Sequence, residues 1–409
     1  MGRRAAGRQG TAAVLAVVVT TFVSTTGDAA ASLALVLDAA RGDQTWRVTE
    51  VFLADLLPPI FLAPAIGALV DRYNARRVWL GGSLAQAALF ACAAAVDGFH
   101  VRVALLALSG VLAVATGAAS FALLPDISGV DRIARANSWM TTAASAAALA
   151  GPGAGGAVHT ALGTGWILAF DALSFLAVAG AAAFVAPTRS APPPTGKPLH
   201  EPTRRGLRLL RRNGATGPLL PVLAATILAT AVEGVAGVFY LREVTGSDSA
   251  YGQLLSAWAL GSVIGALLAS WNRLDGRETL LVGGGAALMG AALLAEGLIP
   301  LTGAIAVAFL AGGLGNGTHN AGVRTLVHRH VPAADHGVAW ACYRVLANTC
   351  VTTGYLLGTP GVLLGARTLI VLSGAGTLLA ALYAYHRLHP SRREPAGESV
   401  GTPQREPSA

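Results

Sequence analysis

Long apolar stretches recur along almost the whole chain, and short polar or charged segments separate them. Most run for about 20 residues, which is the length a helix needs to cross the hydrocarbon core of a bilayer. Twelve stretches of this kind are found, at 11–37, 48–70, 78–96, 101–124, 138–161, 165–186, 217–241, 251–271, 279–298, 301–323, 338–361 and 366–386. The pattern predicts an all-α integral membrane protein with twelve transmembrane helices.

The polar segments divide these spans into two groups of six. The segment 187–216 carries three consecutive prolines and several arginines, so it cannot cross a membrane and is expected to link the two groups. The expected parts are an N-terminal cytoplasmic tail (1–10), a six-helix bundle (11–186), a cytoplasmic linker (187–216), a second six-helix bundle (217–386) and a disordered cytoplasmic tail (387–409).

The two groups of spans also repeat each other. Asp28 in the first span has its counterpart in Glu233 of the seventh span, about 205 residues later. Gly151-Pro152 in the fifth span likewise corresponds to Gly358-Thr359-Pro360-Gly361 in the eleventh. Such a repeat is typical of transporters built from two pseudo-repeats that bind substrate between them near the bilayer midplane.

The distribution of basic residues predicts the orientation. With an inside N-terminus, 23 of the 29 Lys and Arg residues fall in the tails and in the loops of one side. Five lie on the other side, namely Arg41, Arg47, Arg102, Arg242 and Arg367, and Arg344 lies within the eleventh span. Cytoplasmic loops carry such an excess, so we expect both termini in the cytoplasm. We expect the protein to lie in the inner, or cytoplasmic, membrane of the cell. The net charge of +8 therefore reflects topology, and no nucleic-acid partner is expected.

Composition agrees with a membrane protein, because 54% of the residues are hydrophobic, only 12% are charged and 50 are glycine. The three cysteines lie inside apolar runs and predict small buried side chains rather than disulfides. His328, His330 and His336 have no nearby Cys or acid to complete a metal site. We expect no metal, no cofactor and no enzymatic activity, and we expect a monomer.

The loop between the second and third spans carries a recognisable motif, Gly67-Ala-Leu-Val-Asp71-Arg72-Tyr-Asn74-Ala75-Arg76-Arg77. It resembles the pattern G-x-x-x-D-R-x-G-R-R/K found at this position in the major facilitator superfamily. Asn74 replaces the second Gly of the pattern and Ala75 replaces an Arg. Asn adopts a left-handed backbone more readily than most residues, so the turn is expected to survive. The resemblance implies the major facilitator fold.

The same resemblance implies that Gly67, Asp71, Arg72 and Arg76 form a cytoplasmic gate, with Asp126 at the end of the fourth span as the acid that pairs with the arginines. An alternative is purely topological, since basic residues in this loop would anchor it in the cytoplasm whatever their partners.

The fifth span contains Gly151-Pro152-Gly-Ala-Gly155-Gly156. Pro bends a helix and Gly allows a neighbouring helix to approach. The stretch resembles the G-P-x-x-G-G core of the motif of exporters in this superfamily, which are antiporters, although Ala147 replaces an upstream glycine. A generic flexible helix is the alternative.

Acids inside the hydrocarbon are costly and are candidates for function. Asp28, Asp55 and Glu233 are proton or substrate candidates, because low-dielectric surroundings disfavour the charged form of a carboxyl group. Structural acids beside a water-filled vestibule are the alternative. Asp171 and Glu296 lie near span ends, and we expect them at the membrane interface. Asn316, Asn320 and Arg344 are further candidates, which could bind substrate or a neighbouring helix.

Several short segments, among them Asp171-Ala-Leu-Ser-Phe175 and Gly315-Asn316-Gly317, together resemble the branch that contains the enterobactin exporter and macrolide efflux proteins. The resemblance implies secondary active, proton-coupled efflux of a small amphipathic compound by alternating access, with the lipid bilayer, protons and a small-molecule substrate as partners. Uptake or facilitated passage of a metabolite is the alternative, and a non-transporting sensor is a second one. No ATP-binding P-loop exists in the chain, because Pro198 follows the only lysine, Lys197.

Overall fold

The computed structural model describes residues 2–42, 44–70, 73–128, 133–185, 208, 211, 216–270, 277–331, 336–361 and 364–388. Within these ranges the structure contains twelve long α-helices and no strand. Six form an N-terminal bundle: α1 (Gly2–Arg41), α2 (Trp46–Val70), α3 (Ala75–Ala95), α4 (Phe99–Ser128), α5 (Ile133–Leu162) and α6 (Thr164–Val185). The short 3-10 helix η2 (Gly217–Leu219) then precedes α8 (Leu220–Thr245), α9 (Asp248–Ala269), α10 (Glu278–Leu298), α11 (Thr302–His330), α12 (His336–Leu357) and α13 (Ala366–Leu388), which form the C-terminal bundle.

Several helices extend beyond the predicted spans. The fourth was expected to end at residue 124, but α4 continues through Pro125 to Ser128. The tenth was expected to end at residue 323, but α11 continues to His330. The added turns carry polar and basic residues, so they lengthen the helix without lengthening the apolar stretch that predicted it.

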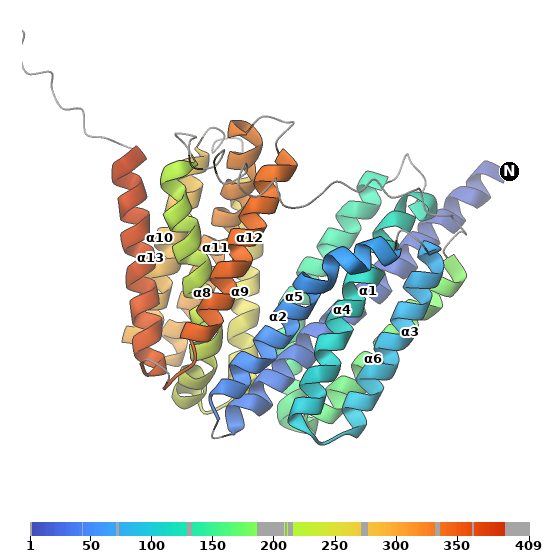
Figure 1. Ribbon diagram of the computed structural model, residues 1–409, viewed down its shortest axis with the longest axis horizontal. Coiled ribbons are helices and arrows are strands. Elements are labelled where there is room, and N and C mark those ends of the chain that lie inside the picture. The colour runs from blue at the N-terminus through green and yellow to red at the C-terminus, as the bar shows by residue number, and fades with distance from the viewer. Residues whose placement is uncertain are drawn as a thin grey trace, which may run out of the picture.

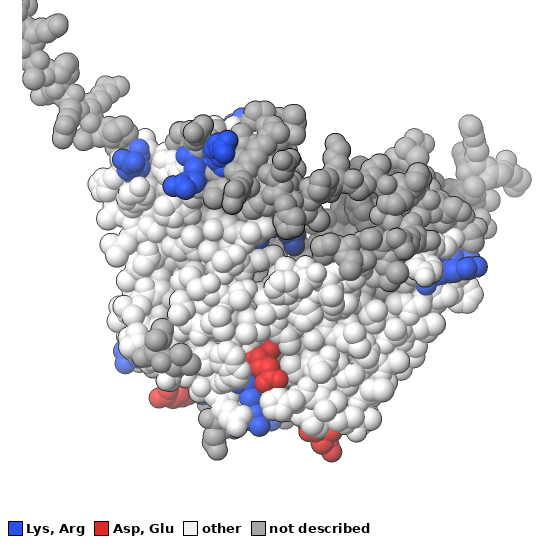
Figure 2. Space-filling model, viewed as in Figure 1, with Lys and Arg blue, Asp and Glu red and all other residues white. Residues whose placement is uncertain are grey.

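Membrane character is visible on the outside of the molecule. Eight helices within the described ranges are long and apolar enough to cross a membrane. Large apolar side chains such as Phe61, Phe121 and Phe184 are exposed, which suits contact with lipid rather than water. A broad band without charged side chains separates the charged ends of the visible face (Figure 2).

Short turns between helices are built by capping residues. Gly246 has a φ of 66° and ends α8, and Ser247 accepts a hydrogen bond from the Ala250 N–H at the start of α9. Gly supplies the left-handed conformation and Ser satisfies a free helix N–H. Because only two residues separate α8 from α9, the end of one helix is held close to the start of the next.

Glycines allow the closest helix packing in the C-terminal bundle. A Cβ atom on Gly313 or Gly317 of α11 would lie 2.0 Å from a backbone oxygen of α9, and one on Gly261 or Gly265 of α9 would lie 2.1 Å from a backbone oxygen of α11. Any larger residue would therefore force the two backbones apart. These contacts hold α9 closely against α11.

The two bundles lie side by side (Figure 1). They converge where α1 meets α2 and diverge toward the end at which α1 begins (Figure 1). We call the first end the closed end, defined by Arg41, Thr49, His159, Asp248 and Thr359, and the other the diverging end. The largest buried apolar cluster includes residues of both bundles, such as Leu37 and Leu241.

Candidate functional site

Two aspartates of the N-terminal bundle face each other. Asp28 on α1 is half-buried and Asp171 on α6 is fully buried. Their carboxyl groups are close enough to hydrogen-bond if a proton is shared between them. Ser174 donates to Asp171 Oδ1 at 2.8 Å, whereas Asp171 Oδ2 has no partner. The expectation that Asp171 lies at the membrane interface is wrong, because its face of α6 packs on α1.

A glycine provides the space for this aspartate pair. A Cβ atom on Gly27 would lie 2.1 Å from Asp171 Oδ1. The Gly27-Asp28 dipeptide therefore does two things at once, since the first residue makes room for the Asp171 carboxyl and the second places a carboxyl beside it.

Asp55 on α2 is the third acid of this region. It is exposed and lies within electrostatic range of Asp28. It is also near Tyr355 of α12, whose ring stacks on Phe52 with centroids 4.8 Å apart. Three carboxyl groups from α1, α2 and α6 therefore lead from the interior of one bundle to the contact with the other.

The C-terminal bundle has its own pair of buried acids. Glu233 on α8 and Glu296 on α10 are within electrostatic range of each other, and the buried Tyr251 of α9 is near both. Glu296 was also expected at the interface, and this too is wrong, because its side chain is only 2% exposed. Near the end of its span, α10 packs on α8 and α13, which cover it.

Charged residues join the bundles at the closed end. Asp248, the first residue of α9, accepts from Arg41 Nη2 at 2.5 Å and from Arg242 Nε at 2.8 Å. Arg41 ends α1 of the N-terminal bundle, while Arg242 belongs to the last turn of α8 in the C-terminal bundle. One carboxylate thus bridges two guanidinium groups from different bundles.

A buried histidine extends this network. His159 of α5 lies with Nε2 2.9 Å from Asp38 Oδ1 and with Nδ1 3.5 Å from Asp248 Oδ2. Thr164 donates to the other oxygen of Asp38 at 2.6 Å. Beside it, the hydroxyl groups of Thr49 and Thr359 are 2.5 Å apart across the bundles. The closed end is therefore held by specific polar contacts.

Sequence reasoning missed this network. It assigned Arg41 and Arg242 to topology, and it did not single out Asp38, His159 or Asp248. A detectable signal existed, since the side predicted to be outside carries only five basic residues, and these charges lie at helix ends next to tight turns. Only the packing of α5 on α9 brings them together.

The glycines of the α5 motif lie at that packing contact. A Cβ atom on Gly151 would be 2.6 Å from Ala29 Cβ, and one on Gly155 would be 2.8 Å from Ala30 Cα, both on α1. A Cβ atom on Gly156 would instead be 3.0 Å from the backbone oxygen of Asp248 on α9. The motif therefore lets α5 approach its own bundle with one set of glycines and the other bundle with another.

The motif between α2 and α3 lies partly outside the described residues. Asp71 and Arg72 are not described, and neither are the surroundings of Gly67 or the side chain of Asp126. Arg76 donates to the Ala183 carbonyl of α6, and its expected pairing with Asp126 lies outside the described residues.

Asn74 acts differently from the expectation. Its φ is −64°, so it is not left-handed; its side chain caps α3 by accepting from the Arg76 N–H at 3.0 Å. Asn is a good N-cap residue, so Asn74 begins α3 by capping.

The polar candidates of α11 and α12 are dispersed. Asn316 donates to Ser262 of α9 at 3.4 Å and accepts from Asn320 at 2.8 Å, and Asn320 itself is exposed. The contact with Ser262 favours a helix-packing role for Asn316. Arg344 is exposed in the third turn of α12.

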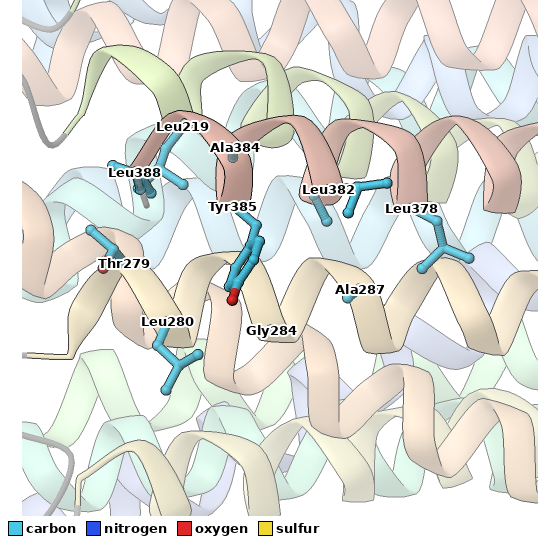
Figure 3. A pocket seen from close by; sticks show the side chains of 12 residues that line it. Leu219, Thr279, Leu280, Gly284, Ala287, Leu378, Leu382, Ala384, Tyr385 and Leu388 are labelled. Carbon is cyan, nitrogen blue, oxygen red and sulfur yellow. The ribbon is translucent and has the colours of Figure 1, made fainter. Parts of the chain in front are cut away.

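A separate pocket of about 420 Å³ lies between α10 and α13. Gly283 and Gly284 form one wall, and Tyr385 projects from α13 toward α10 (Figure 3). No acid or base lines it; its lining is Leu219, Thr279, Leu280, Gly283, Gly284, Ala287, Leu378, Ala381, Leu382, Ala384, Tyr385 and Leu388. It is distinct from the acid pairs and provides no group for ion coupling.

The sequence was compared with models of known protein families. The model described as Major Facilitator Superfamily matches residues 17–348 and 222–407. The chain belongs to this superfamily. The resemblance in the loop 67–77 is thereby confirmed at the level of the superfamily, and the protein is a multi-pass membrane transporter.

Solved structures of transporters share the fold. A bacterial homologue of the human lysosomal transporter Spinster, in an inward-facing and unoccupied conformation, aligns with a TM-score of 0.67 at 12% identity, covering 93% of this chain and 97% of that one. A bacterial homologue of the iron transporter ferroportin, in an inward-facing state, gives 0.70 at 17% identity, with 92% and 99% covered. A POT family transporter in complex with a thioalcohol-conjugated peptide gives 0.71 at 9% identity, with 90% and 94% covered. The sequence matched none of the curated proteins compared with it.

Proposed function

We propose that the protein is a proton-coupled exporter of a small amphipathic organic compound, working as a monomer in the inner membrane of a bacterium by alternating access. Both termini lie in the cytoplasm, and the described conformation has its closed end toward the outside. The cargo belongs to the range of drugs, antibiotics and siderophore-like metabolites that the enterobactin-exporter and macrolide-efflux branch carries.

The pair formed by Asp28 and Asp171 is the observation that supports proton coupling most directly. An ionised carboxylate buried without a cation is very costly, and neither side chain forms an ion pair in the described ranges. A proton held by the pair would remove that cost and supply the missing hydrogen bond. When the bundles rearrange and water reaches Asp28, the proton can leave.

The two ends of the molecule support alternating access. At the closed end, the network of Asp248 joins the bundles, and at the diverging end the ribbons separate (Figure 1). In the opposite state, contacts at the diverging end would hold the bundles together. Asp71, Arg72, Arg76 and Asp126 are the residues we assign to that gate.

The preference for export rests on α5. Its Gly151-Pro152 and Gly155-Gly156 pairs place the helix between the bundles, where it must rearrange during the cycle. Asp28 and Asp55 are acidic side chains between the interior of the N-terminal bundle and its contact with the other bundle, and they favour a cationic or neutral cargo over an anion.

Inverted membrane vesicles with an acid lumen test the proposal. Addition of hydrophobic drugs and metabolites should collapse the proton gradient in wild-type vesicles, because cargo enters as protons leave. Asp28→Asn should lower this cargo-dependent release without lowering expression. Asp97→Asn is the matched control, since Asp97 is exposed outside the helices and pairs only with Arg102, at 3.6 Å.

Proton release that is undiminished in Asp28→Asn would exclude this residue as a coupling site. Uptake of cargo that is independent of the gradient would instead make the protein a facilitator or an importer. Absence of any transported compound across the panel, with the protein intact, would favour the non-transporting sensor.

A further inference from the structure

Glu233 and Glu296 form a second pair of acids deep in the C-terminal bundle, on α8 and α10. Glu233 is 9% exposed and Glu296 is 2% exposed. One carboxyl oxygen of each, Oε1, is buried without a hydrogen-bond partner. The two side chains are within electrostatic range of each other. Repulsion therefore adds to the cost of burial if both are ionised.

The groups that could neutralise these acids are engaged elsewhere. The Tyr240 hydroxyl donates to the backbone oxygen of Glu296 at 3.0 Å, and Arg367 Nε donates to the backbone oxygen of Gly297 at 2.8 Å. Tyr251 of α9 is a titratable neighbour of both acids, Tyr355 of α12 lies near Tyr251, and neither tyrosine supplies a positive charge. Within the described ranges no cation pairs with either carboxylate.

A glycine provides space for the Glu233 carboxyl group. A Cβ atom on Gly237, one turn after Glu233 on α8, would lie 2.5 Å from Glu233 Oε1. Gly27 provides similar room for Asp171 in the other bundle, although there the glycine and the acid lie on different helices, α1 and α6. In both places a glycine admits a carboxyl group into close helix packing, where an apolar side chain would otherwise be expected.

We propose that Glu233 and Glu296 together are a second proton-binding site, located in the C-terminal bundle and separate from the Asp28–Asp171 site. Its part in coupling rests on the proposed function. Each bundle then carries one proton site, and a complete cycle exchanges two protons for one cargo molecule.

Infrared spectroscopy of the purified wild-type protein in H₂O and D₂O tests proton binding without any cargo. The carbonyl band of protonated carboxyl groups should lose a component in the double variant Glu233→Gln/Glu296→Gln. The control Glu243→Gln, an exposed glutamate of the same helix, should leave the band unchanged. Gly237→Ala should shift the component, because the added methyl displaces the Glu233 carboxyl.

The number of protons released per cargo molecule tests coupling in vesicles. It should fall from two to one in the double variant and stay at two in Glu243→Gln. A protonated-carboxyl band identical to wild type in both the double variant and Gly237→Ala overturns the site, and so does an unchanged proton count. If wild-type vesicles release no protons on cargo addition, the proposed function fails, whereas the infrared result still decides whether the pair binds a proton.

Discussion

At the scale of single residues, Asp248 has the widest set of partners at the contact between the bundles. It is 8% exposed, and its two oxygens accept from guanidinium groups of both bundles while His159 lies beside it. Hydrogen bonds to charged groups contribute about 1.5–3 kcal/mol each. Because the Arg41 side chain is 48% exposed, solvent reduces its share.

Asp248→Asn should therefore weaken the closed end by about 1–2 kcal/mol and shift the conformational equilibrium roughly 5–30-fold toward separation there. Spin labels at Gln44 and Glu243, both exposed near this end, would report longer distances in the variant. Cys92, the exposed native cysteine, is first replaced by Ser. Identical distance distributions in wild type and Asp248→Asn would contradict the role, and Asp97→Asn serves as the control.

The sequence alone indicated that Asp28 and Glu233 lie within apolar spans, but it did not indicate their partners. An acid inside an apolar run can be recognised from the sequence alone, so both residues could be found. Asp171 and Glu296 were misplaced because they lie near span ends, where a carboxylate can reach water; only packing against another helix decides between the two environments. Asp248 looked like an ordinary acid at a helix start, because its partner Arg41 is 207 residues away along the chain.

At the scale of elements, α5 has a different small-residue surface for each neighbour. Gly155 touches α1 and Gly156 touches α9. The sequence predicted that this stretch permits close approach, and the structure identifies the helices that approach. Which neighbour each glycine contacts follows from its position around the helix and from the tilt of the bundles, which no local pattern encodes.

Gly156→Val should prevent the closed end from forming, because its Cβ would lie 3.0 Å from the backbone oxygen of Asp248 and 3.3 Å from Gly252 Cα. Disulfide formation between cysteines at Thr49 and Thr359 measures closure, as their hydroxyl groups are 2.5 Å apart. We expect at least a severalfold loss of cross-linking. Gly180→Val, where nothing lies within 4 Å of the added Cβ, should cross-link like wild type; equal yields in all three proteins would disprove the steric argument.

At the scale of the whole molecule, the twelve predicted spans and the internal repeat were sufficient to predict two six-helix bundles. Hydropathy predicts membrane helices well because a bilayer leaves few other options for the backbone. The conformation was beyond reach of the sequence, since different arrangements of the two bundles use the same spans. The ends of α4 and α11 were underestimated for a related reason: helices continue into the polar interface where hydropathy no longer marks them.

The orientation of the molecule can be tested with two exposed positions at opposite ends of α2, Gln44 and Tyr73. In the Cys92→Ser background, a cysteine at Gln44 should react with a membrane-impermeant maleimide in intact cells. A cysteine at Tyr73 should react only in inverted vesicles. The reverse pattern would mean that the excess of Arg does not set the topology of this chain.

The bridge between Arg41 and Asp248 also makes the transporter sensitive to the electrolyte on one side of the membrane. Separating the bundles at the closed end pulls opposite charges apart, and dissolved ions lower the energy of the separated charges. The screening length is about 10 Å at 0.1 M salt and about 3 Å at 1 M. Concentrated salt on the closed-end side should therefore speed the opening step, while the same salt on the other side leaves it unchanged, so that the ionic composition of the surroundings sets part of the turnover rate.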